Sequence, residues 1–151
     1  MLFKDILWVF FISMLPVVEL RGAIPAGVTL GIPITLDYII CVIGNMLPIP
    51  FVMLFLKALL VQLSKLPKIG GFFAKIISRA DEKALKIGKY EFWGLFLFVA
   101  IPIPGTGAWT GALVAAALRM RLKKAMAAIF LGVLTSGIIV SLITVGVSTV
   151  I

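Results

Sequence analysis

Two long apolar runs dominate the pattern of hydrophobic and polar positions along the chain. They cover roughly residues 38–60 and 125–150. About 20 apolar residues suffice for one helix to cross the ~30 Å hydrocarbon core of a bilayer. The pattern therefore predicts two transmembrane helices.

Two further apolar segments, residues 4–31 and 92–118, are each interrupted near the middle. The first contains MLPVVELRGAIPAG at residues 14–27, and the second contains AIPIPGTG at residues 100–107. Each piece of the second segment has about 13 residues, which at a rise of ~1.5 Å per residue extends only ~20 Å. One piece cannot cross the bilayer core, so each segment is either one kinked helix or a re-entrant hairpin of two half-helices.

The region between the two halves is basic and amphipathic. Apolar residues recur there at helical spacing, and the basic residues fall mostly on the other side. The apolar positions are Phe72, Phe73, Ile76, Ile77, Ala80 and Ala84. This pattern predicts an amphipathic helix lying along the cytoplasmic membrane surface.

The distribution of charge favours hairpins over kinked helices. The net charge is +8, and residues 1–61 hold equal numbers of acidic and basic residues, so the excess lies entirely in 62–91 and 119–124. Positively charged flanks prefer the cytoplasm, and a helix that crossed at 92–118 would put these two clusters on opposite sides. A hairpin keeps both inside. The same reasoning makes residues 4–31 a second hairpin that enters from the outer face, with the N-terminus outside.

Composition limits the chemical functions that the chain can perform. The chain is 62% hydrophobic and contains no histidine, which excludes imidazole metal ligands and histidine acid–base catalysis. The single cysteine, Cys41, lies in an apolar run and is expected to be a small buried side chain. No nucleophile motif, paired carboxylates or phosphate-binding loop is present. We therefore expect an integral membrane protein that is not an enzyme and needs no metal or cofactor. The basic clusters are interpreted as membrane flanks, not as a nucleic-acid surface.

The two halves resemble each other when the chain is shifted by 88 residues. The identities pair Phe10 with Phe98, Pro16 with Pro104, Leu30 with Leu118, Gly44 with Gly132 and Leu54 with Leu142. The predicted fold is an all-α integral membrane protein, a single membrane domain over residues 1–151. It contains an inverted repeat of re-entrant hairpin plus transmembrane helix, at 4–61 and 92–151, joined by the cytoplasmic amphipathic connector 62–91.

Glu19 and Arg21 are the leading candidates for a functional site. Charged side chains inside a bilayer are costly and are functional candidates by default. Two residues apart on a regular helix they would point in different directions, whereas in a hairpin turn they can face one cavity. The alternative is a helix that ends at Val18, with both charges in the headgroup zone.

The second broken centre supplies further candidates. Two half-helices that meet near the midplane leave free N–H groups whose positive dipole ends attract anions. The expected substrate-binding residues there are Gly105, Thr106, Gly107, Trp109 and Thr110. The alternative is a packing corner of small residues. Asn45 is a further expected substrate-binding residue, and its amide either bonds across to a hairpin or satisfies carbonyls freed by the prolines that follow it.

Three motifs in order, VELRGAIPAG, GNMLPIP and AIPIPGTGAWTGAL, resemble the small multidrug export proteins of bacterial membranes over nearly the whole chain. The architecture is also similar to the DedA superfamily, whose members are known as SNARE-associated or VTT-domain proteins. That resemblance implies paired re-entrant hairpins and proton-coupled recycling of the lipid carrier undecaprenyl phosphate. Glu19 would match the embedded acid of the first hairpin. The second hairpin here lacks an arginine, because Arg119 and Arg121 lie beyond it.

These features are compatible with three functions. The first is a secondary transporter or lipid-carrier translocase for an anionic headgroup, in the bacterial or archaeal inner membrane, with Arg21 holding the phosphate and Glu19 exchanging a proton. The second is a small multidrug or cation exporter in which Glu19 anchors the cation and Trp109 stacks on it. The third is a structural membrane protein without a substrate. Membrane lipids are the expected partners, and the thin wall that such a short chain presents favours a homodimer.

Overall fold

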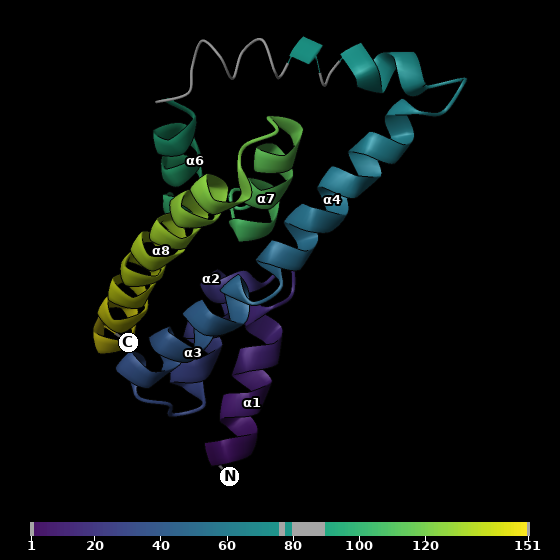
Figure 1. Cartoon of the computed structure of the whole chain (residues 1–151). Helices are drawn as coiled ribbons and strands as arrows, with labels where there is room; N and C mark the ends of the chain where they lie inside the picture. Colours follow the sequence, from purple (N-terminus) through teal and green to yellow (C-terminus); the bar gives the residue numbers. More distant parts are fainter. Residues whose placement is uncertain (1, 76–77, 80–89, 151) are drawn as a thin grey trace.

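The computed structural model describes residues 2–75, 78–79 and 90–150, and these residues form helices and turns without a strand (Figure 1). The helices are α1 (Leu2–Ser13), α2 (Glu19–Thr29), α3 (Ile34–Met46), α4 (Ile49–Ser64), α6 (Tyr90–Ala100), α7 (Ala108–Ala117) and α8 (Leu122–Val150). The expected all-helical fold is confirmed over these residues.

Both predicted transmembrane helices are present as long apolar helices. The first runs for 31 residues through α3 and α4, and the second is α8 with 29 residues. At Leu47 and Pro48 the backbone stays in the right-handed helical region although the regular hydrogen bonding lapses. Because a proline removes one amide donor and crowds the preceding turn, Pro48 and Pro50 account for this bend between α3 and α4.

Helices α1, α2, α6 and α7 are short. They contain 12, 11, 11 and 10 residues in α1, α2, α6 and α7. At 1.5 Å per residue each extends about 15–18 Å, roughly half of the bilayer core. The second interruption falls at residues 101–107, as predicted. The first is shorter than predicted, because only residues 14–18 leave the helix and Pro25 lies inside α2.

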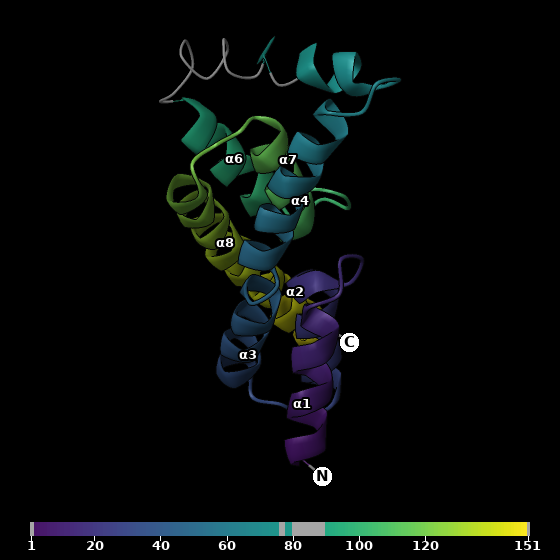
Figure 2. The ribbon, with the colours of Figure 1, turned by 45° about the vertical axis from the view of Figure 1, so that its right-hand side comes forward.

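The short helices pair into two hairpins, each packed on its own long helix. α1 and α2 contact each other and α3, whereas α6 and α7 contact each other and α8. Figures 1 and 2 show the first group below and the second above, with α4 reaching up to α7 and α8 passing down to α2. This crossed packing brings the non-helical tip of one hairpin against the tip of the other.

Small residues allow the close approach within each group. A Cβ added to Gly44 of α3 would lie 2.0 Å from Ser13 Oγ of α1. A Cβ added to Gly132 of α8 would lie 2.7 Å from Val99 Cβ of α6. Backbones therefore pack here at distances that any larger residue would prevent, as small residues commonly permit between membrane helices.

The predicted amphipathic connector is described only in part. Residues 70–75 and 78–79 are helical, which agrees with the prediction. Residues 76–77 and 80–89, which carry the rest of that prediction, lie outside the described part of the chain.

Candidate functional site at the two hairpin tips

Glu19 begins α2 in an unusual backbone conformation. Its φ is +49°, in the left-handed region that a residue with a Cβ seldom adopts. Its N–H donates to Leu15 O at 2.9 Å, so the tight turn over residues 14–18 is closed by backbone bonding. Strained residues of this kind cluster at functional sites, where the surrounding structure holds them.

The Glu19 carboxylate caps the N-terminus of α7, the second helix of the other hairpin. Its Oε1 accepts the backbone N–H of Trp109, in the first turn of α7, at 3.1 Å. A Cβ added to Gly107 would lie 1.6 Å from Glu19 Oε2, so only glycine leaves room for the carboxylate. A negative charge at a helix N-terminus is favourable because the free N–H groups carry partial positive charge. Glu19 is only 5% exposed, which strengthens this interaction.

Arg21 performs the complementary task at the end of α6. Its Nη2 donates to Val99 O at 3.2 Å, to Ile101 O at 3.0 Å and to Thr106 O at 3.0 Å. Its Nη1 also donates to Ile103 O. The carbonyls at a helix C-terminus carry partial negative charge and lack helical partners, and the prolines of this loop cannot donate to them. The guanidinium of the first hairpin therefore holds the interrupted backbone of the second.

Both charged side chains line one cavity of about 430 Å³ between the tips. The sequence-based expectation that Glu19 and Arg21 can face one cavity agrees with this geometry. Their strongest polar contacts are to the other hairpin's backbone. The cavity wall consists of Pro16, Val17, Val18, Glu19, Arg21, Gly22, Pro102, Pro104, Gly105, Gly107 and Thr110.

The two threonines of the second tip have different places. Thr106 Oγ1 donates to Ile101 O and to Ile103 O, both at 2.8 Å, and so braces the loop from inside. Thr110 lines the cavity. Gly105, with φ +88°, supplies a left-handed turn directly before Thr106, a conformation that glycine adopts without a Cβ clash.

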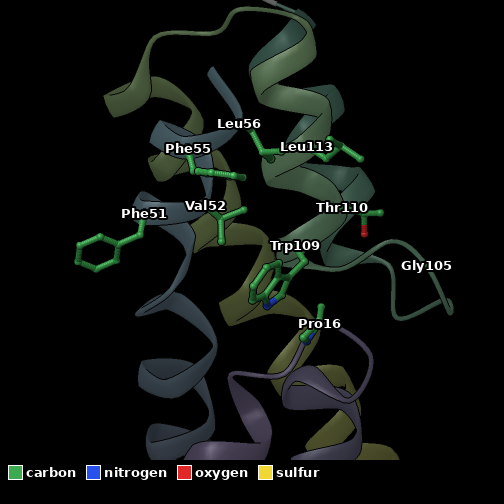
Figure 3. A pocket seen from close by; sticks show the side chains of 9 residues that line it. All are labelled: Pro16, Phe51, Val52, Phe55, Leu56, Gly105, Trp109, Thr110 and Leu113. Atoms are coloured by element: carbon green, nitrogen blue, oxygen red, sulfur yellow. The ribbon is translucent and has the colours of Figure 1, made fainter. Parts of the chain in front are cut away.

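Trp109 lies beside the cavity in a separate apolar groove. Its indole Nε1 donates to Met14 O of the first tip at 3.0 Å. Figure 3 shows the ring at the lower end of a groove of about 600 Å³ between α4 and α7, with the α4 residues above it. Pro16, Gly105 and Thr110 border both the groove and the polar cavity. The two spaces are therefore neighbours.

Asn45 is not among the residues that line the cavity. It is 1% exposed on α3, and neither polar atom of its side chain has a hydrogen-bond partner within the described chain.

Asp37 is the buried group that sequence reasoning underestimates. The sequence marks it as an acid at the outer end of a helix, and it does fall in the first turn of α3. Its side chain is nevertheless fully buried, against Gly27 of α2. The available signal was the spacing of Asp37, Cys41 and Asn45, four residues apart and therefore on one helix face.

Two helices long and apolar enough to cross a bilayer, with the shorter apolar helices α6 and α7 beside them, indicate a helical membrane protein. The sequence matches the model of the family described as "Putative small multi-drug export protein" over residues 19–139. The chain belongs to this family. Comparisons with curated proteins and with solved structures gave no match.

Gly107→Ala tests the contact between Glu19 and α7. The added methyl group should expel the carboxylate from the helix N-terminus and lower the stability by about 1–3 kcal/mol. With Trp8 and Trp93 replaced by Phe, the emission of Trp109 should shift to longer wavelength as the tip opens. Gly94→Ala is the matched control, since a Cβ there meets nothing within 4 Å. Equal melting temperatures and spectra for the two variants would contradict the assigned contact.

Proposed function

We propose that this chain is an exporter of small amphipathic cations, coupled to protons that Glu19 exchanges. Membership of a small multi-drug export family supports a transport role. The observation that carries the choice of substrate is the polarity of the cavity between the tips, which offers few available donors to an anion.

Few donors around this cavity are available to an anion. The Arg21 guanidinium, which has five N–H groups, already donates to four carbonyl oxygens, those of Val99, Ile101, Ile103 and Thr106. Pro16, Pro102 and Pro104 contribute no N–H to the wall. The Glu19 carboxylate occupies the N-terminus of α7, the position that an anionic substrate would need. A substrate that brings its own positive charge and donors suits this wall better than an anion does.

The neighbouring groove suits the apolar part of such a substrate. Trp109, Phe51 and Phe55 line it, and an aromatic face attracts both flat apolar groups and cations. Cavities of 300–1,000 Å³ are typical for drug-sized ligands. The cavity and groove together therefore match a molecule with a charged end and an apolar body.

Proton coupling follows from the double role of Glu19. A protonated carboxyl loses its favourable interaction with the positive end of α7, so its hold on the second tip weakens. The tips can then part and expose the cavity to the other side of the membrane. Deprotonation restores the contact and attracts the next cation. A substrate that displaces a proton from Glu19 is thereby exported against proton entry.

A lipid-carrier translocase for an anionic headgroup is the second candidate. The apolar groove favours it, because an acyl or isoprenoid chain would fit along α4 and α7. It requires Arg21 to release its carbonyl partners and bind phosphate instead. The relation to the DedA superfamily, on which this function was expected, stays a proposal, as does a homodimer.

We further propose that each hairpin is re-entrant and that the two halves form an inverted repeat. The element boundaries support this, since a shift of 88 residues carries α1 onto α6, α2 onto α7 and α3–α4 onto α8. The C-terminal ends of α2 and α7 also agree in detail. Ile32 N donates to Gly27 O and Met120 N donates to Ala115 O, both at 3.0 Å, and each motif holds one residue with positive φ, Gly31 and Arg119.

Thiol labelling tests this topology in the inner membrane. In a Cys41→Ser background, Lys4→Cys should react with an impermeant maleimide added outside intact cells. Lys68→Cys should react only after the membrane is opened, because the connector is proposed to be cytoplasmic. Labelling of both positions from the same side would exclude the proposed arrangement.

Transport into proteoliposomes tests the proposed function. Under an imposed pH gradient, the wild type should move ethidium, a flat aromatic cation, and Glu19→Gln should reduce the rate by roughly a hundredfold, the scale of a lost proton-transfer group. Arg121→Gln, which removes an exposed charge outside the cavity, is the control and should keep the wild-type rate.

The same vesicles separate the two candidates. Undecaprenyl phosphate, offered in place of ethidium, should not be moved by the wild type if the cation proposal holds. Movement of the lipid phosphate without movement of ethidium, lost in Arg21→Ala, would establish the lipid-carrier function instead.

A further inference from the structure

A stripe of buried polar residues runs along one face of α3. Asp37, Cys41 and Asn45 follow each other at intervals of four residues, and their exposures are 0%, 0% and 1%. Buried polar side chains are expensive inside a membrane and are rarely kept without a role. None of these three lines the cavity at the hairpin tips.

The stripe has unfulfilled hydrogen-bonding capacity. Asp37 Oδ2, both polar atoms of the Asn45 side chain and Ser136 Oγ of the adjacent α8 are buried without a partner in the described chain. Each such group costs about 1–3 kcal/mol unless something completes it. Groups of this kind are commonly completed by water molecules that bridge two to four polar atoms.

The antiparallel packing of α2 and α3 brings Asn45, at the C-terminal end of this stripe, to the level of Glu19. A Cβ added to Gly27 of α2 would lie 2.1 Å from Asp37 Oδ1, so these two residues face each other. From that contact, eight residues along α3 lead to Asn45, and eight residues back along α2 lead to Glu19. At 1.5 Å per residue both lie about 12 Å from the contact, because the two helices run in opposite directions.

The charged and titratable groups near Asp37 leave it without a cationic partner among the described residues. Its Oδ1 accepts the Cys41 thiol at 3.4 Å. Among the helices packed on α3, α1 carries Lys4 and Asp5 near its start, α2 carries Glu19 and Arg21 near its start, α4 carries Lys57 beyond the bend, and α8 carries Lys123 and Lys124 at its opposite end. Burying an unpaired carboxylate is costly, so this site favours the protonated form of the Asp37 carboxyl.

We infer that Asp37, Asn45 and Ser136 form the path by which protons reach Glu19 from the side of the membrane where α3 begins. This inference rests on the proposed proton-coupled export. The proton leaves the Asp37 carboxyl, passes along water held by Asn45 and Ser136, and binds the Glu19 carboxylate. Asp37 then takes a new proton from the outer solution, so that one proton enters for each proton that Glu19 receives.

Two variants of the path are compared with one matched control. Asp37→Asn removes the transferable proton while preserving the shape of the side chain, and Asn45→Leu removes the polar group that would hold water. Asp5→Asn removes a carboxyl from α1, outside the stripe. Melting temperatures show whether each variant is folded, and Asn45→Leu keeps the test decisive if Asp37→Asn fails to fold.

The first readout is ethidium movement in proteoliposomes with and without a pH gradient. Both path variants should lose gradient-driven transport by roughly tenfold or more, as expected when a proton-transfer group is removed. They should retain ethidium exchange at equal pH, which needs no net proton entry, whereas Asp5→Asn should behave as the wild type. Gradient-driven transport at the wild-type rate in folded Asp37→Asn would overturn the inference.

The second readout is independent of transport. After a pH jump, time-resolved infrared spectroscopy follows the protonated carboxyl band that is absent from Glu19→Gln. The rise of this band should be slowed in both path variants and unchanged in Asp5→Asn. If the wild type moves no ethidium but this difference appears, the proposed function fails and the path stands. If the band rises at the same rate in all variants, the path is wrong.

Discussion

The structure depends on two charged side chains of the first interrupted helical segment that bind the backbone of the second. Glu19 caps the start of α7 and Arg21 caps the end of α6, although both residues belong to the first hairpin. Each charge meets the helix end of opposite partial charge. The first hairpin therefore stabilises the second at the point where the helices of the second are interrupted.

This interaction answers a constraint that the membrane imposes. Backbone polar groups at membrane depth need partners from protein or from a water-filled cavity, because lipid offers none. At the second tip the prolines remove donors, and four carbonyl oxygens gather on the Arg21 guanidinium instead. Because the caps are charged side chains and not regular backbone bonds, the proposed export cycle would release the second tip by protonating Glu19 or by bringing in a charged substrate. A rigid, fully hydrogen-bonded helix would offer no such adjustment.

Much of this architecture could be read from the sequence. Hydropathy located both long helices, and the positions of proline and glycine located both interruptions, since each signal is local. The shift of 88 residues that pairs Pro16 with Pro104 also describes the observed helix boundaries. Glu19 and Arg21 were identified because charged side chains inside an apolar segment are costly and therefore indicate a functional role.

The partners of these charges could not be read in the same way. The carbonyls that Arg21 binds lie about eighty residues away, and backbone acceptors leave no mark in a sequence. Trp109 was expected at the site but faces the neighbouring groove, because its indole is held by a carbonyl of the other tip. Asp37 was expected at the outer end of its helix, and its burial could not be foreseen because it depends on Gly27 packing against it.

Hydrogen–deuterium exchange of the second tip, compared between the wild type and Arg21→Gln, tests the capping of the second hairpin by the first most directly. Losing the charge-assisted bonds should cost about 1.5–3 kcal/mol and speed exchange over residues 101–110 by roughly ten- to a hundredfold. Arg121→Gln should leave that segment unchanged. Faster exchange confined to α2, with residues 101–110 as protected as in the wild type, would contradict the account.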